Sequence, residues 1–173
     1  MDKKHYIIVS VTLGVIAASA AALIGLTNLI TKNRIEENKK IKINNGIAEI
    51  FGKEALIQNE YSFENNEYQY VNYVYEIQKE NMIGYAFKTE GSNMYGKISL
   101  IVGFDNANSF VSLSIVEDEQ TYATALEDDY VAPLISGSRD LDDVSCGATF
   151  GAKLVRDMVN DAKKANEEKV WIK

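Results

Sequence analysis

The pattern of hydrophobic and polar residues divides the chain into an apolar N-terminal run and a body in which the two kinds alternate. Residues 6–30 read YIIVSVTLGVIAASAAALIGLTNLI and contain no charged side chain. As a helix rising 1.5 Å per residue, this run would be roughly 38 Å long. That length crosses a hydrocarbon core of about 30 Å with some tilt. We therefore expect an N-terminal membrane anchor over residues 1–30.

A cleaved signal peptide is the alternative interpretation of the same run, because ASAAA at 18–22 resembles a small-residue cleavage site. The apolar residues continue to Ile30, however, well beyond a typical signal core of about 7–15 residues. This favours a retained anchor. Flanking charge gives only a weak indication of orientation: Lys3 and Lys4 precede the run, more basic residues follow it, and the count would place the body inside.

The segment that follows the anchor is predicted to be helical. Residues 31–52 are rich in helix formers, and Ile35, Ile43, Ile47 and Ile50 have the spacing of one helical face. Asn44-Asn45-Gly46 predicts a break, followed by a second short helix. Because residues 59–67 are polar and turn-like, we treat 31–66 as a juxtamembrane helical segment and 67–173 as the domain.

From residue 68 onward the apolar period becomes two, as in half-buried strands. Four such sets lie within residues 68–77, 85–87, 98–102 and 111–115. They predict antiparallel strands, with a hairpin turn in GFDNANS at 103–109. The tyrosines in these strands favour sheet packing over stacking on a planar ligand.

The C-terminal part is predicted to be helical after a mixed segment. Residues 117–143 show no clear period and predict loops with a short helix across the sheet. After Thr149, five apolar residues form one helical face, Leu154, Val155, Met158, Val159 and Ala162. The whole pattern predicts an α+β protein: one transmembrane helix, then one domain with an antiparallel sheet and flanking helices.

Composition narrows the classes of function. Of the formal charge of -7, residues 1–34 carry +3, from four basic side chains against Asp2, which leaves -10 for residues 35–173. Such an acidic body would repel phosphates, so nucleic-acid binding is not expected. Cys146 is the sole cysteine, which excludes an intrachain disulfide or a Cys-rich metal site. His5, the sole histidine, is far from Cys146 in sequence, so Ser-His and Cys-His catalysis have no evident base.

Residues 143–149, DVSCGAT, place three hydroxyl or thiol side chains within five residues. Without a base, hydrolase chemistry at Ser145 or Cys146 is disfavoured. Thr149 precedes the amphipathic helix, where free backbone N–H groups and the helix dipole favour a phosphate. Gly147 permits close approach of the chain, and Ala148 is small. From the residues alone, however, the role that we favour for Thr149 is that of a helix N-cap.

This order of parts resembles the covalent FMN-binding domain family. Its best-known members are the G subunit of Rnf-type ion-translocating oxidoreductases and the C subunit of sodium-pumping NADH:quinone oxidoreductases. The resemblance rests on Asp143-Val144-Ser145-Cys146-Gly147-Ala148-Thr149, on NMYGKISLIVGFDNANSFVSLSIVEDEQT, and on the single N-terminal anchor. It covers about residues 6–165.

The resemblance implies that Thr149 carries FMN through a phosphoester, added by a separate flavin transferase. The residues that it places at the cofactor are Thr149, Ser145, Cys146, Gly147 and Ala148. It implies that the transferase reads Asp143, Gly147, Ala148 and Thr149, and that the flavin lies near an acidic loop, here Glu119, Gln120 and Thr121. No catalytic acid or base and no metal site is expected.

The sequence departs from the family pattern at two places. Cys146 stands where Ser or Thr is usual, and Phe150-Gly151 replace residues that often carry hydroxyl groups. The family's Glu-Thr-Pro-Gly-Leu-Gly loop is reduced to Glu119-Gln120-Thr121 followed by Tyr122-Ala123. Both departures lie at the expected flavin site.

We therefore expect a single-pass electron-transfer flavoprotein in the cell membrane, a subunit of an Rnf-like complex whose other membrane subunits are its partners. The family's extracytoplasmic placement outweighs the charge count for the body. One alternative is an anchored non-redox binding or sensor module that has lost the flavin. A pilin-like subunit is a second, but MDKKHYIIVS lacks the usual Gly-Phe-Thr-Leu-Ile-Glu start.

Overall fold

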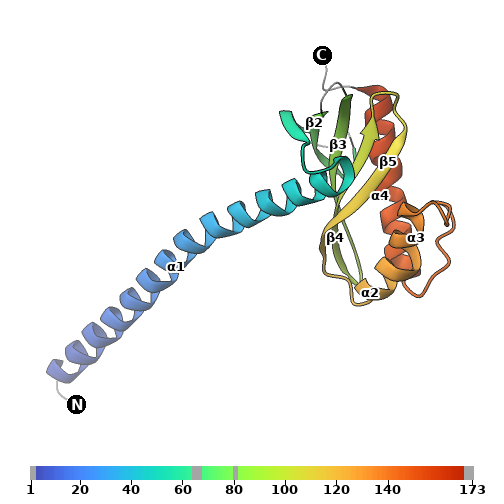
Figure 1. Cartoon of the computed structure of the whole chain (residues 1–173). Helices are drawn as coiled ribbons and strands as arrows, with labels where there is room; N and C mark the ends of the chain where they lie inside the picture. The colour runs from blue at the N-terminus through green and yellow to red at the C-terminus, as the bar shows by residue number, and fades with distance from the viewer. Residues whose placement is uncertain (1–2, 64–67, 80–81, 170–173) are drawn as a thin grey trace. The chain divides into compact units, whose positions relative to one another are not determined.

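The computed structural model describes residues 3–63, 68–79 and 82–169, and the chain divides into two compact units, Met1–Ile41 and Lys42–Lys173. Helix α1 (Lys3–Phe51) forms the first unit and ends in the second. The second unit contains a five-stranded sheet and the remaining helices (Figure 1). An N-terminal helix followed by an antiparallel sheet with flanking helices confirms the α+β prediction.

In the first unit the described residues, from Lys3 onward, form helix alone, and the large apolar side chains described in this part of the helix are exposed. Tyr6–Asn28 is long and apolar enough to cross a membrane. Leu13 is 67% exposed and Ile24 is 71% exposed. Three hydroxyl side chains in the span, Thr12, Ser19 and Thr27, donate to the carbonyl oxygen four residues earlier. These three hydroxyl groups therefore find their acceptors within the helix, as an apolar solvent requires.

The predicted helix break at Asn44-Asn45-Gly46 is wrong, because α1 continues through these residues to Phe51. Gly46 is buried, and a Cβ there would come within 3.2 Å of both the Ile101 side chain and the Ser114 hydroxyl. Close packing on the sheet therefore outweighs the low helix propensity of this segment. The helix ends at Gly52, whose φ of +94° is available mainly to glycine.

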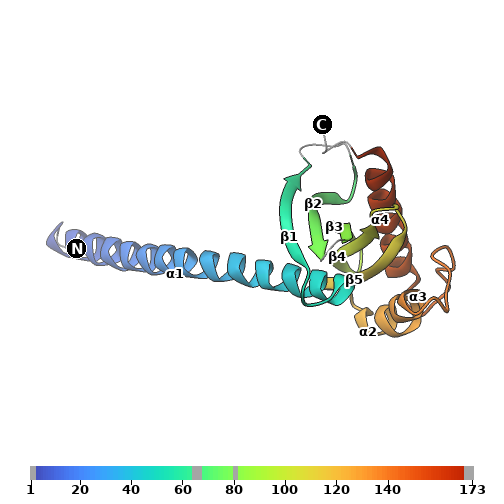
Figure 2. The same cartoon turned by 45° about the horizontal axis from the view of Figure 1, so that its top comes forward.

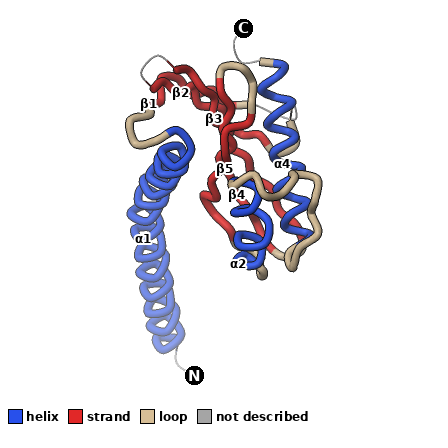
Figure 3. The backbone as a smooth tube through the Cα atoms, turned by 45° about the vertical axis from the view of Figure 1, so that its right-hand side comes forward, coloured by secondary structure: helices blue, strands red, loops and turns tan. Residues whose placement is uncertain are grey.

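The sheet is an antiparallel meander in the order β1-β2-β3-β4-β5, coloured red in Figure 3. Its strands are β1 (Leu56–Ser62), β2 (Val71–Lys79), β3 (Met82–Asn93), β4 (Gly96–Asp105) and β5 (Phe110–Asp118). The helical prediction for 31–66 therefore holds only to Phe51, and residues 56–62 form a strand that sequence analysis missed. Because β1 is an edge strand exposed along most of its length, its LIQNEYS sequence shows no apolar alternation.

Both faces of the sheet are covered. Helix α4 (Thr149–Glu168) packs on one face and buries Val155, Met158 and Ala162 completely (Figures 1 and 3). On the other face, Ile47 from the end of α1 packs with Ile77 and Ile101. Strand β4 is consequently buried on both faces, and the prediction of half-buried strands is wrong for this one.

The segment between β5 and α4 contains three short helical pieces in succession, visible in Figure 2 beside α4. They are α2 (Ala123–Leu126), the π-helical turn η1 (Glu127–Val131) and α3 (Ala132–Ile135). Leu126 and Tyr130 bury their side chains in the core that α4 forms with the sheet. A short helix within 117–143 is therefore confirmed. Its buried side chains fix the segment that precedes the DVSCGAT motif.

Candidate functional site

Thr149 is the first residue of α4 and lines a hollow of about 300 Å³. The hollow is bounded by Gly147 to Gly151, by Gln120 and by the rings of Tyr95 and Tyr122. These residues come from the start of α4, the segment after β5 and the turn between β3 and β4. The fold therefore brings two of the segments singled out from the sequence, 119–121 and 143–149, to one place.

The Thr149 hydroxyl is not used to cap the helix. Its Oγ1 donates to the carbonyl oxygen of Cys146 at 2.8 Å. The N-cap position is occupied by Ala148, and no side chain caps the helix. The first-turn N–H groups of a helix have no intrahelical acceptors, so an uncapped start is open to an anion. Thr149 thus lies beside these donors, with an oxygen that is only partly buried.

Gln120 holds the acidic loop against the hollow. It is 8% exposed, and its side-chain amide donates to Asn93 Oδ1 and to the Gly96 carbonyl oxygen. Asn93 in turn donates to the carbonyl oxygen of Phe150 at 3.2 Å, which links the β3–β4 turn to the start of α4. Gly96 has φ +140°, and a Cβ there would lie 2.2 Å from the Glu119 carbonyl oxygen. Glycine is therefore required for the loop to approach the turn this closely.

The neighbours of Gln120 point outward. Glu119 and Thr121 are exposed and do not line the hollow. Each is attached to the β3–β4 region by its backbone: Glu119 N–H donates to the Lys97 carbonyl oxygen and Thr121 N–H to that of Tyr95. Of the three loop residues named from the sequence, only Gln120 faces the Thr149 hollow.

Three aromatic rings form a wall of the hollow that sequence analysis did not assign to the site. Tyr95 lies 5.6 Å between ring centroids from both Tyr122 and Phe150. Tyr122 is 53% exposed and Phe150 is 50% exposed, so the wall is open to solvent on one side. The signal in the sequence was indirect: Phe150 marked a departure from the family pattern, and Tyr95 lies in a turn without periodicity. Such rings offer a surface for a planar ligand.

The residues before Thr149 form an exposed loop with defined contacts. Asp143 and Ser145 are exposed, and Cys146 is partly buried. Arg139 donates to the carbonyl oxygens of Asp143 and Ser145 at 2.9 and 3.1 Å. None of Asp143, Ser145 and Cys146 lines the hollow, whereas Gly147 and Ala148 do. The motif thus divides into an outer half, held by Arg139, and an inner half at the hollow.

The carboxylate of Asp129 lies close to the inner half of the motif. A Cβ on Gly147 would come 3.3 Å from Asp129 Oδ2 and 3.5 Å from Ala125 Cβ, so the absence of a side chain leaves room for both. Nearby, burial raises the pKa of Asp118, although the Gln120 N–H bonded to its carboxylate opposes this. Burial also raises the pKa of Tyr130 to about 12, and its hydroxyl donates to the Leu141 carbonyl oxygen.

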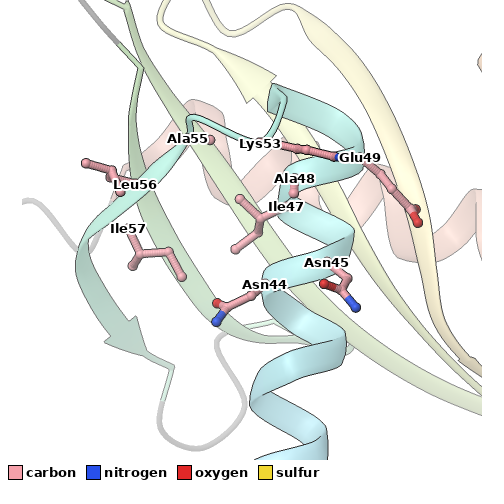
Figure 4. A pocket seen from close by; sticks show the side chains of 9 residues that line it. All are labelled: Asn44, Asn45, Ile47, Ala48, Glu49, Lys53, Ala55, Leu56 and Ile57. Carbon is pink, nitrogen blue, oxygen red and sulfur yellow. The ribbon is translucent and has the colours of Figure 1, made fainter.

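A larger hollow of about 810 Å³ lies away from the motif, between the end of α1 and β1. Figure 4 shows the Ile47 and Ala48 side chains on the helix and Leu56 and Ile57 on the strand. None of the residues predicted for the site lines it. Its lining lacks the combination of free helix N–H groups and aromatic rings found at Thr149.

The family model of the RnfG N-terminal region matches residues 1–50. The chain is similar to RnfG. This confirms the resemblance to a G subunit of Rnf-type complexes over these residues, which include the span in α1 that is long and apolar enough to cross a membrane. The matched residues cover α1 and stop before the Thr149 motif. No curated protein matches the chain.

Proposed function

We propose that the chain is the G-type subunit of an Rnf-like ion-translocating electron-transport complex and carries FMN as a phosphoester on Thr149. The observation that supports this most is the position of Thr149. Its hydroxyl lies at an uncapped helix start, in a hollow with three aromatic rings, within a chain whose first fifty residues are RnfG-like. The similarity supports membership of such a complex, and the geometry supports Thr149 as the attachment point.

The residues at the hollow fit the phosphate end and part of the ring system of FMN. The start of α4 offers backbone N–H groups to an anion, and Tyr95, Tyr122 and Phe150 offer faces for stacking. A volume of about 300 Å³ is at the lower end of ligand pockets. A flavin held there would remain partly exposed, as a carrier that exchanges electrons with a partner requires.

The attachment needs no base from the chain itself. Thr149 Oγ1 would lose its proton to a base of the transferase and form a bond to the FMN phosphorus, while the bond between that phosphorus and the leaving group of the flavin donor would break. A separate flavin transferase supplies the acid–base chemistry. In the mature protein the isoalloxazine would supply the redox chemistry, and the chain would position it.

The exposed half of the motif suits recognition by the transferase. Asp143 and Ser145 are accessible, and Arg139 fixes the backbone between them through two carbonyl oxygens. Gly147 and Ala148 keep the approach to Thr149 free of large side chains. We place this body on the extracytoplasmic side of the cell membrane, anchored by α1 as a single span, and assign the other membrane subunits of the complex as its partners.

Coexpression with a flavin transferase tests the assignment. The wild-type chain should keep flavin fluorescence on a denaturing gel, and Thr149→Val should abolish it. Two controls should remain fluorescent: Thr124→Val, which removes an exposed threonine from α2, and Cys146→Ser, which restores the more usual residue of the motif.

Two results would contradict the proposal. Fluorescence that survives Thr149→Val would move the attachment to another residue. A wild-type chain that stays colourless would remove the covalent flavin and favour an anchored non-redox binding module on the same fold.

A further inference from the structure

We propose that a second hollow, between the β4–β5 turn, α3 and α4, binds a small carboxylate with an apolar body. It has a volume of about 320 Å³. It shares no lining residue with the Thr149 hollow. Asn160, a residue that lines this second hollow, lies eleven residues after Thr149 along α4, which corresponds to roughly 16 Å. This inference is therefore independent of the proposed flavin.

The apolar walls of this hollow come from four parts of the fold. Phe104 and Phe110 approach from the strands, Leu134 from α3, Leu141 from the following loop and Val159 from α4. Leu134 and Leu141 are only partly buried, and Phe110 is 40% exposed. Protein interiors are normally packed without such gaps. A hydrocarbon group of a ligand in this space would make van der Waals contacts with these partly exposed side chains and would cover the exposed part of Phe110.

The polar groups at the hollow supply donors and a positive charge. Lys163 lines it and has no ion pair in the described part of the chain. Asn108 accepts a hydrogen bond on its Oδ1 from Asn166 at 3.3 Å, which leaves its own side-chain N–H groups to donate. Ser109 and Asn160 add further polar groups. An ammonium group with amide donors favours an anionic acceptor, and a carboxylate is the common small group of that kind.

The nearest carboxylate of the turn is already engaged elsewhere. Asp105 Oδ1 accepts the backbone N–H groups of Ala107 and Ser109 at 2.9 and 2.8 Å. Asp105 lines a different hollow, beside Ile83 and Gly84, and does not line this one. No acidic side chain is among the lining residues, so the charge of Lys163 faces the hollow without a partner from the walls.

A hydrogen bond between a buried and a partly buried asparagine holds the turn at the edge of the hollow. Asn166 is fully buried, and its Oδ1 has no hydrogen-bond partner among the described residues. Its amide donates to Asn108, which has a left-handed backbone with φ +63°. Buried polar atoms are normally satisfied, so this arrangement is retained at a cost in stability. It fixes the direction in which Asn108 presents its free amide.

The test uses the full-length chain in lipid nanodiscs and ligand-observed ¹⁹F NMR with 4-fluorophenylacetate. The matched uncharged probe is 4-fluorophenylacetamide. We expect saturable binding of the carboxylate in the millimolar range or tighter, and weaker binding of the amide. Lys163→Gln should weaken carboxylate binding about tenfold, because a charge-assisted hydrogen bond is lost, and leave amide binding unchanged.

Two further variants make the result decisive. Leu134→Trp should fill the hollow and abolish binding of both probes, while Lys153→Gln, a lysine of the same helix near the Thr149 hollow, should change neither. Carboxylate binding that is absent at millimolar probe, or that is unaffected by both Lys163→Gln and Leu134→Trp in folded protein, would overturn the proposal. Flavin attachment at Thr149 is expected to be the same in all these variants, so the two proposals fail separately.

Discussion

Helices α1 and α4 are both long and rich in apolar residues, yet their side chains meet different surroundings. In α1, large apolar residues of the span are exposed, and Leu13 and Ile24 exceed 60% exposure. In α4, apolar residues occupy one face, and Val155, Met158 and Ala162 are fully buried on the sheet. A helix that is apolar on all sides needs an apolar solvent, whereas a helix with one apolar face needs a protein partner. The first is long and apolar enough to serve as a membrane anchor, and the second positions Thr149.

The strongest test of the difference between the two helices is to introduce one carboxylate into each of them. Met158→Asp in α4 buries a charge and should cost more than about 4 kcal/mol, enough to prevent folding of the body. Ile16→Asp in α1 should leave the unfolding of the body unchanged and weaken membrane insertion by about 3 kcal/mol. Near-ultraviolet circular dichroism of the tyrosines measures the first effect, and extraction with alkaline carbonate measures the second.

If Ile16→Asp lowered the melting temperature of the body as strongly as Met158→Asp, α1 would be a packed helix of the protein and not a lipid-facing one. The opposite failure, a Met158→Asp variant that folds normally, would contradict the packing of α4 on the sheet.

Substitution of one glycine beneath α4 and of one glycine in α1 tests the same difference with a smaller expected effect. Gly91 lies in β3 beneath α4, and a Cβ there would come 2.8 Å from Leu154 Cδ1 and 3.2 Å from Met158 Sδ. Gly14 in α1 has nothing within 4 Å. Gly91→Ala should therefore lower the free energy of unfolding by about 1–3 kcal/mol. Gly14→Ala should not lower it, because alanine has the higher helix propensity. Urea unfolding of both variants gives the comparison.

Alkaline pH should affect the body by a smaller amount and leave the anchor in the membrane. The pKa of Tyr130 is raised to about 12 by burial, and burial also raises that of Tyr75. Because the folded pKa exceeds the ordinary value of 10, this stabilisation is complete below pH 10 and is lost as the pH rises from 10 toward 12. Melting temperatures across this range should fall in the wild type.

Tyr130→Phe isolates that contribution. It removes the hydrogen bond to the Leu141 carbonyl oxygen and should cost about 1 kcal/mol at neutral pH. Its melting temperature should then depend less on pH above 10 than that of the wild type. Parallel curves for the two proteins would show that the Tyr130 hydroxyl does not titrate in this range.

The sequence predicted correctly those helices and strands whose apolar residues follow a regular pattern along the chain. The span in α1 follows from an uninterrupted run without charged residues, the buried face of α4 follows from the helical period of its apolar residues, and the four apolar strand sets follow from alternation. Strand β1 was missed because an exposed edge strand carries no apolar alternation. The break at Gly46 was wrong because contacts with Ile101 and Ser114, distant in sequence, hold that residue in the helix.

The sequence allowed us to predict the attachment residue of the candidate site but not the aromatic residues that line it. Thr149 at the start of a helix follows from the amphipathic pattern after it, and its role follows from the family resemblance. The wall of Tyr95, Tyr122 and Phe150 depends on how the β3–β4 turn approaches the start of α4, through hydrogen bonds of Asn93 and Gln120. The contact between the β3–β4 turn and the start of α4 joins segments that are distant in sequence, so no local pattern of apolar residues predicts it.

Mass spectrometry of the trypsin fragment that contains Thr149 tests the central proposal most directly. Cleavage after Arg139 and Lys153 releases residues 140–153, which include both Thr149 and Ser145. From protein matured with a flavin transferase, this peptide should carry the mass of FMN less one water, and fragment ions should place it on Thr149. An unmodified peptide, or a modification on Ser145, would contradict the assignment.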